Sequence, residues 1–192
     1  MKTQTPEIKE NVAKEELPAP GGIGMAVAVD WGLAVQVVLT LIITIVGTTL
    51  GQSEMTKIPV LSFPLSSILF FIVALFFACV LIWFGEMVRS GHYWARMIQI
   101  VFSVLLTLLG LSRLVGFYHS VTTGNFWPLV TAIILLIISP LTVWRMIGSS
   151  TGRWFKFVTF AEARKRHGGK WVWCIVLCSI IGGILQTIAS IR

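Results

Sequence analysis

Five long apolar runs dominate this sequence and restrict what the chain can fold into. They cover residues 31–50, 60–84, 97–118, 128–147 and 171–191. Each run reaches about 20 residues or more, which is the length that an α-helix needs to cross the hydrocarbon core of a bilayer. A backbone in lipid must pair its own N–H and C=O groups, and the runs lack the alternating pattern of a membrane barrel. The sequence therefore predicts an all-α, multi-pass membrane protein, a bundle of about five transmembrane helices.

The composition supports a membrane location. Hydrophobic residues make up 56% of the chain and charged residues 12%, whereas a soluble domain carries about 25% charged residues. Residues 1–22 differ from the rest, because they are polar, mixed in charge and end in the turn-prone stretch LPAPGG. We expect a flexible cytoplasmic tail over 1–22 and one transmembrane helical domain over 23–192.

Lysine and arginine residues predict the orientation of the bundle. The N-terminal tail and the connections on its side of the membrane carry twelve of them, whereas Lys57 and Arg192 are the two on the other side. Cytoplasmic segments carry an excess of these residues, so we expect the N-terminus in the cytoplasm and the C-terminus outside. The short connections favour a bacterial source, and the expected location is the bacterial inner membrane.

The connection over 149–170 is strongly basic. Six basic residues stand there with one acid, Glu162: Arg153, Lys156, Arg164, Lys165, Arg166 and Lys170. No nucleic-acid recognition motif accompanies them, so we expect no nucleic-acid partner. We predict a basic cytoplasmic loop that contacts anionic lipid headgroups together with Trp154. In a second interpretation, Arg153–Arg166 forms an interfacial amphipathic helix.

All eight tryptophans lie at or just outside the ends of the apolar runs, at positions 31, 83, 94, 127, 144, 154, 171 and 173. Indole rings favour the headgroup region of a bilayer, where one side of the ring is apolar and the other is wet. We therefore expect the tryptophans to form belts at the membrane surface.

Two charged residues lie in or beside apolar runs. Arg113 follows Met97 by 16 residues, which places it about 24 Å along a helix. It either extends toward the outer headgroups or is a buried contact for an anion or a partner helix. Within the chain, Glu54 lies at a suitable depth to pair with Arg113. Asp30 is an N-cap if the first helix begins at Trp31, and an acid within the membrane and a functional candidate if it begins near Ile23.

The fifth run carries small residues at helical spacing. Cys178 precedes Gly182 by four positions, and Ser179 precedes Gly183 by four. This spacing lets helices approach closely, so Gly182 and Gly183 are candidate contacts with a partner, with packing inside the bundle as the alternative. The sequence also predicts a kink at Pro140 and a surface ion pair between Glu86 and Arg89. The three cysteines, Cys79, Cys174 and Cys178, are expected to be small buried packing residues without a disulfide or metal.

Two short motifs suggest a resemblance. They read Gly91-His92-Tyr93-Trp94-Ala95-Arg96 and Arg153-Trp154-Phe155. The stretch from about Ser90 to Phe155 resembles small uncharacterised multi-span bacterial inner-membrane proteins, in which such a turn joins two spans and such a motif follows a later one. The resemblance implies a bundle in the inner membrane and assigns no functional residue. Those proteins tend to have four spans, whereas this chain has five apolar runs.

The sequence contains no arrangement of residues that is typical of a catalytic site, a phosphate loop or a metal site. We therefore expect no enzymatic activity and no cofactor. The leading hypothesis is a non-enzymatic protein that acts through helix–helix contacts with other membrane proteins or itself, such as an accessory subunit of a membrane complex or a toxin-immunity-type protein. The alternative is a small oligomeric transporter or channel with Arg113 near an anion path.

Overall fold

The computed structural model describes residues 20–49 and 64–191, and every element in these ranges is helical. In chain order the elements are α2 (Gly21–Thr49), α3 (Pro64–Arg89), α4 (Tyr93–Ser112), α5 (Leu114–Thr122), α6 (Pro128–Ile133), the π-helix η2 (Ile134–Ile138), α7 (Ser139–Ile147), α8 (Ser149–Phe157), α9 (Phe160–Arg166) and α10 (Lys170–Ile191). Five helical segments are long and apolar enough to cross a membrane: α2, α3, α4, the continuous α6–η2–α7 segment, and α10. This confirms the predicted all-α architecture with five helices of spanning length.

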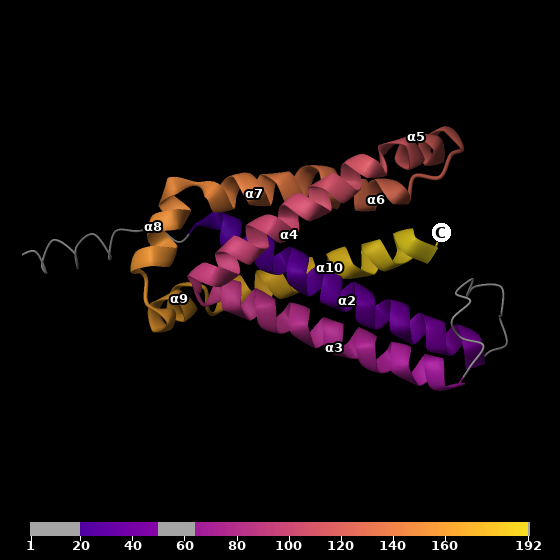
Figure 1. Cartoon of the computed structure of the whole chain (residues 1–192), viewed down its shortest axis with the longest axis horizontal. Coiled ribbons are helices and arrows are strands. Elements are labelled where there is room, and N and C mark those ends of the chain that lie inside the picture. Colours follow the sequence, from indigo (N-terminus) through magenta and orange to yellow (C-terminus); the bar gives the residue numbers. More distant parts are fainter. Residues whose placement is uncertain (1–19, 50–63, 192) are drawn as a thin grey trace, which may run out of the picture.

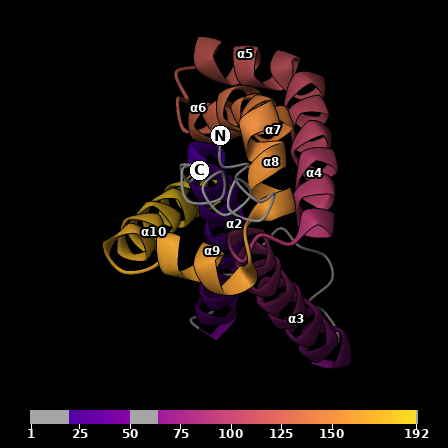
Figure 2. The ribbon, with the colours of Figure 1, turned by 90° about the vertical axis from the view of Figure 1, so that its left-hand side faces the viewer.

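The spanning helices form two arms that diverge from one end of the molecule (Figure 1). The first arm contains α2, which packs along both α3 and α10, and the second contains α4, which packs along α7. Smaller contacts of α2 with α7, α3 with α4, and α10 with α6 connect the arms. Figure 2 looks along the molecule and shows α2 near its centre, between α10 on one side and α4 on the other. Because α2 belongs to the first arm and also contacts α7 of the second, residues on this helix contribute to the junction between the arms.

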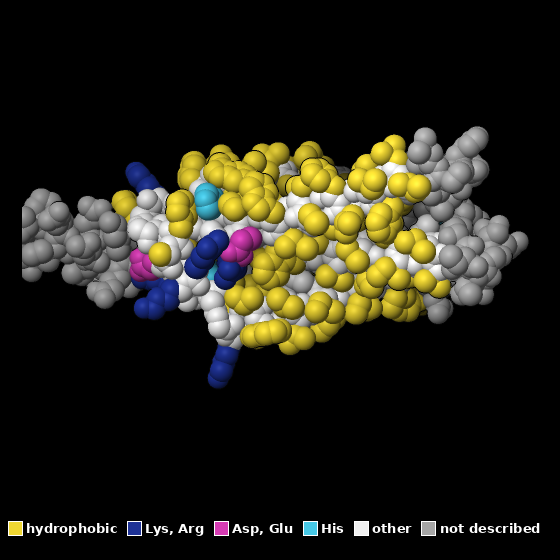
Figure 3. All heavy atoms as spheres, turned by 90° about the horizontal axis from the view of Figure 1, so that it is seen from below, with side chains coloured by type: hydrophobic (Ala, Val, Ile, Leu, Met, Phe, Trp, Pro, Cys, Tyr) yellow, Lys and Arg dark blue, Asp and Glu magenta, His cyan; other side chains and the backbone are white. Residues whose placement is uncertain are grey.

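The short helices α8 and α9 close the end where the arms meet, which we call the basic end. Lysine and arginine side chains gather there, whereas hydrophobic side chains cover most of the adjoining described surface in Figure 3. The basic residues of this end are Arg89, Arg96, Arg145, Arg153, Lys156, Arg164, Lys165, Arg166 and Lys170. The opposite end, where α5 and the C-terminal part of α10 lie, is called the far end.

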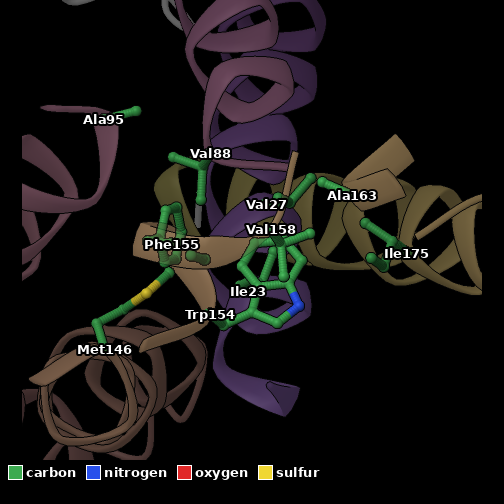
Figure 4. Packing of buried hydrophobic residues seen from close by; sticks show 11 residues of the cluster. Ile23, Val27, Val88, Ala95, Met146, Trp154, Phe155, Val158, Ala163 and Ile175 are labelled. Carbon is green, nitrogen blue, oxygen red and sulfur yellow. The ribbon is translucent and has the colours of Figure 1, made fainter. Parts of the chain in front are cut away.

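A hydrophobic core fills the basic end (Figure 4). Trp154, Phe155 and Val158 project from the α8 region, and they pack with residues from six other helices. These are Ile23, Ala26 and Val27 of α2, Val88 of α3, Ala95 of α4, Met146 of α7, Ala163 of α9 and Ile175 of α10. The cluster brings both arms together at the basic end.

Two helix boundaries differ from the sequence-based expectation. The first helix begins at Gly21 instead of at Trp31, in agreement with the alternative start near Ile23, and the apolar residues from Ile23 onward pack into the core of the basic end. The third predicted span, 97–118, crosses a break at Arg113, which separates α4 from α5. At this break the hydroxyl of Ser112 donates to the carbonyl of Leu109 at 2.8 Å, and such a bond competes with the regular helical pattern.

The segment around Pro140 is irregular. Proline has no N–H group and its ring crowds the carbonyl four residues earlier, so a regular α-helical turn cannot continue through it. Here the preceding residues form the π-helix η2, in which the N–H of Ser139 bonds to the carbonyl of Ile134, five residues earlier. The Ser139 hydroxyl donates to the same carbonyl at 2.9 Å. The irregularity beside Pro140 is therefore a π-helix that ends two residues before it, at Ile138.

Candidate functional site

Asp30 lies inside the bundle. Because α2 begins at Gly21, Asp30 is about 14 Å along the helix from its start. Its side chain is 0% exposed. The N-cap interpretation is therefore wrong, since Asp30 lies within a helix that is long and apolar enough to span a membrane. Such residues are costly in a membrane and usually mark functional positions.

Gln99 of α4 faces Asp30 across the junction between the arms. Its side chain is also 0% exposed, and its Nε2 donates to Oδ1 of Asp30 at 3.2 Å. The remaining oxygens, Oδ2 of Asp30 and Oε1 of Gln99, are buried and have no hydrogen-bond partner in the described part of the chain. The bond links the first arm to the second, and each of its two side chains keeps one buried oxygen without a partner among the described residues.

Gly85 allows α3 to close over this site. A Cβ at position 85 would lie 2.6 Å from Nε1 of Trp31 and 3.5 Å from Cβ of Asp30. The same Trp31 nitrogen donates to the carbonyl of Ile82 at 3.2 Å. The absence of a side chain at Gly85 thus brings α2 and α3 together and encloses Asp30 between α2, α3 and α4.

Small polar residues continue from Gln99 along the second arm. Ser103 of α4 and Ser139 and Thr142 of α7 are each at most 2% exposed. Thr142 donates to the carbonyl of Ile138 at 2.8 Å, within its own helix as Ser139 does. Because the hydroxyls of Ser139 and Thr142 have partners in the continuous α6–η2–α7 segment, these two residues do not themselves require a ligand.

A groove with a cavity of about 450 Å³ lies between α2, η2 and α10. Small residues form much of its wall: Gly24, Ala28 and Gly32 from α2, and Cys174, Cys178 and Gly182 from α10. Gln186 also lines the groove and is 7% exposed. Its amide makes no hydrogen bond to the described residues. The groove is therefore mostly apolar, with one unpaired amide toward the far end.

The two glycines predicted as contacts have different surroundings. A Cβ at Gly182 would meet nothing within 4 Å, so this position is open to the groove. A Cβ at Gly183 would lie 2.6 Å from Cγ1 of Val35 and 2.8 Å from the carbonyl oxygen of Gly32, so Gly183 packs against α2. Ser179 contacts α2 as well, since its hydroxyl lies 3.2 Å from the carbonyl oxygen of Ala28. The stripe of Ser179 and Gly183 thus packs against α2 within the bundle, whereas the stripe of Cys178 and Gly182 faces the groove.

Arg113 is exposed at the junction of α4 and α5. It lies toward the far end, whereas Asp30 lies nearer the basic end, so the structure does not bring these two candidates together. Glu54 lies outside the described residues. Arg113 does not line the groove between α2, η2 and α10 described above.

The basic residues predicted to contact the membrane surface gather at the basic end. Arg153, Lys156, Arg164, Lys165 and Lys170 are exposed, and Arg166 forms an ion pair with Glu162. The expected interfacial helix is divided into α8 and α9 by an extended backbone at Val158 and Thr159.

Trp154 differs from the expected surface contact. It is 0% exposed, with its ring 5.0 Å from that of His167 between centroids. The turn between α8 and α9 folds α8 onto the ends of the long helices, which buries this side chain.

Arg89 and Arg96, two of the basic residues from which the orientation was predicted, also hold the basic end together. Arg89 pairs with Glu86 through bonds of 2.6 and 2.7 Å, which confirms the predicted pairing, but both side chains are partly buried and not at the surface as expected. It also donates to the carbonyl of His167 at 2.9 Å, at the end of α9. Arg96 donates to the carbonyl of Met146 at 3.0 Å, near the end of α7. Cations near helix C-termini pair with free carbonyls and with the helix dipole.

Of the residues that carry the candidate site, sequence reasoning identified Asp30 and Gly182 and missed Gln99 and Gln186. Each glutamine is an amide inside an apolar run and shares a helical face with small polar residues. That pattern was a usable signal. The described residues contain no group of three histidine, cysteine or acidic side chains that could hold a metal ion. The chain matches no protein-family model, and no curated protein and no solved structure is significantly similar to it.

Proposed function

We propose that this chain is a non-enzymatic protein of the bacterial inner membrane that binds a transmembrane helix of a partner protein. It would act as an accessory subunit of a membrane complex or as a toxin-immunity-type protein. The observation that carries the proposal is the groove between α2, η2 and α10, with the unpaired amide of Gln186 in it.

Gln186 favours a helix over lipid as the occupant of the groove. An amide in an apolar environment is costly unless it is hydrogen-bonded. The acyl chain of a lipid offers neither a donor nor an acceptor, whereas a polar side chain on a neighbouring helix offers both. We therefore expect the partner helix to carry a hydrogen-bonding side chain at the depth of Gln186.

The small residues of the groove favour the same occupant. Gly24, Ala28 and Gly32 recur on one face of α2, and Gly182 leaves open space on α10. Small residues at such spacing let a helix backbone approach closely. In this proposal a ridge of side chains on the partner helix enters the groove, while the exposed basic residues of the basic end contact anionic headgroups in the cytoplasmic leaflet.

The natural cysteines provide the first test. Cys174 and Cys178 line the groove, whereas Cys79 is exposed on α3 and does not line it. In variants that retain only Cys178 or only Cys79, a thiol-reactive photo-cross-linker is attached in native membranes. We expect a cross-linked protein of defined mass from Cys178 and none from Cys79. Cross-links to lipid alone would contradict the proposal, and a cross-link between two copies of this chain would favour the oligomeric transporter or channel.

A second test fills the groove. Gly182→Leu places a large side chain in the open space, and Gly116→Leu on α5 is the matched control, since an added Cβ meets nothing within 4 Å at either position. We expect the cross-linked partner to be lost in Gly182→Leu and retained in Gly116→Leu. Retention of the partner in both variants would show that the groove is not the binding surface.

A further inference from the structure

We propose that Asp30 binds a proton and forms a carboxylic acid–amide pair with Gln99, and that this pair is a proton-controlled joint between the two arms. The joint is independent of the groove and of any partner in it. It connects α2 of the first arm to α4 of the second at a point where both side chains are fully buried.

The hydrogen-bonding pattern requires one more donor. An ionised carboxylate only accepts hydrogen bonds, and the amide oxygen of glutamine only accepts as well. With Nε2 of Gln99 bonded to Oδ1 of Asp30, the unpaired atoms are Oδ2 of Asp30 and Oε1 of Gln99, which are both acceptors. A proton on Oδ2 turns that oxygen into a donor and gives it Oε1 of the same amide as acceptor. A single proton therefore satisfies both orphaned atoms.

The charges on the neighbouring helices do not neutralise Asp30. The titratable residues on the elements packed against this part of α2 are Glu86 and Arg89 on α3, Arg96 on α4, Arg145 on α7, and Lys170, Cys174 and Cys178 on α10. Glu86 pairs with Arg89 and Arg164, and Arg96 donates to the carbonyl of Met146. The side chains of Arg145, Lys170, Cys174 and Cys178 are exposed. No described residue forms an ion pair with Asp30. An unpaired buried carboxylate is costly, and such groups are usually found in their neutral form.

Loss of the proton would change the junction between the arms. The carboxylate would keep one bond to Nε2 of Gln99 and would face Oε1 of the same amide without a proton between them. Water could reach it only if α2 and α4 moved apart. We therefore expect the arms to separate when Asp30 loses its proton.

Asp30 is the only aspartate in the sequence, and this permits a direct test on the unmodified chain. Cell-free synthesis with aspartate labelled with ¹³C at the side-chain carboxyl gives one NMR signal that belongs to Asp30. In lipid nanodiscs at neutral pH we expect the chemical shift of a neutral carboxyl group. The shift of an ionised carboxylate at that pH would overturn the proposal.

The joint is tested with spin labels on the two arms. The native cysteines are replaced by serine, and labels are placed at Ile43→Cys on α2 and Val115→Cys on α5, which are both exposed. Across the pH range in which the Asp30 signal becomes that of a carboxylate, we expect the distance between the labels to increase. Asp30→Asn, which retains an amide pair with Gln99, should hold the distance constant, and Glu86→Gln should behave as the wild type. An unchanged distance in the wild type over that range would overturn the joint.

Discussion

Trp154 is fully buried beneath the loop between α3 and α4, where a Cβ added to Gly91 would lie 3.3 Å from its ring. Removing so large a buried side chain leaves a cavity in the core of the basic end. We expect Trp154→Ala to lower the free energy of unfolding by about 3–5 kcal/mol, measured by denaturant unfolding in detergent. Trp144→Ala is the matched control, because Trp144 is 73% exposed. Equal losses in the two variants would contradict the role of Trp154 as a core residue.

His167 makes the stability of the basic end depend on pH. It lies between the rings of Trp154 and Trp171, with centroid distances of 5.0 and 4.4 Å, and both of its ring nitrogens are buried without a hydrogen-bond partner in the described chain. Burial lowers the pKa of His167 from 6.5 to about 4. In the unfolded chain the imidazole therefore takes up a proton at a higher pH than in the folded chain.

The sign of the effect follows from this difference. As the pH falls from about 6.5 toward 4, the unfolded state gains a proton that the folded state does not, so the folded state loses stability, by up to about 3 kcal/mol. We therefore compare the melting temperatures of the wild type and of His167→Phe. As the pH is lowered from about 6.5 toward 4, we expect the wild type to lose more of its melting temperature than the variant does. Above about pH 7 the difference should be constant. A difference that does not change between pH 7 and pH 4.5 would show that His167 is accessible to protons in the folded state.

At the scale of helices, α2 and α10 approach so closely that Gly183 has no room for a side chain. A Cβ there would lie 2.6 Å from Val35 and 2.8 Å from the backbone oxygen of Gly32, and backbone cannot move aside cheaply. We expect Gly183→Ala to destabilise the protein by about 1–3 kcal/mol. The adjacent Gly182→Ala should be nearly neutral, because its Cβ enters open space. Thermal unfolding of the two variants in one detergent checks this, and equal stability would place the helices farther apart.

The elements differ in how well the sequence predicts them. Length and hydropathy were enough to predict five helices of spanning length, since a bilayer imposes one requirement on each run separately. The sequence left the start of α2 open between Trp31 and Ile23, because an apolar residue such as Ile23 looks the same whether it faces lipid or the core of the basic end. It did not predict the break at Arg113. Trp154 shows the same limit. Its position beside an apolar run is typical of a membrane belt, and only the fold of α8 and α9 determines that it is buried.

The candidate site depends on contacts that local patterns do not encode. Asp30 could be recognised as a candidate from its position, but its partner Gln99 lies 69 residues later in the chain. Their pairing depends on the packing of α4 against α2, while Gly85 lets α3 approach Trp31 and cover the same site. The sequence therefore indicated one member of the pair, while the bond across the arms required the tertiary structure.

At the scale of the whole molecule, the two ends differ in a way that bears on orientation. The described basic residues other than Arg113 lie at the basic end, where Arg89 and Arg96 hold helix ends together and the exposed ones face outward. Positive charge favours the cytoplasmic side during insertion. The same residues therefore stabilise the junction of the arms and favour one orientation of the bundle.

This asymmetry leads to a prediction for intact cells that express the chain. In a background with the native cysteines replaced by alanine, Ser150→Cys lies in α8 at the basic end and Thr123→Cys lies at the far end, and both positions are exposed. We expect a membrane-impermeant maleimide to label Thr123→Cys in intact cells and Ser150→Cys only after the membranes are opened. The reverse pattern would place the basic end outside. It would mean that the basic residues are retained for the contacts of Arg89 and Arg96 rather than for orientation.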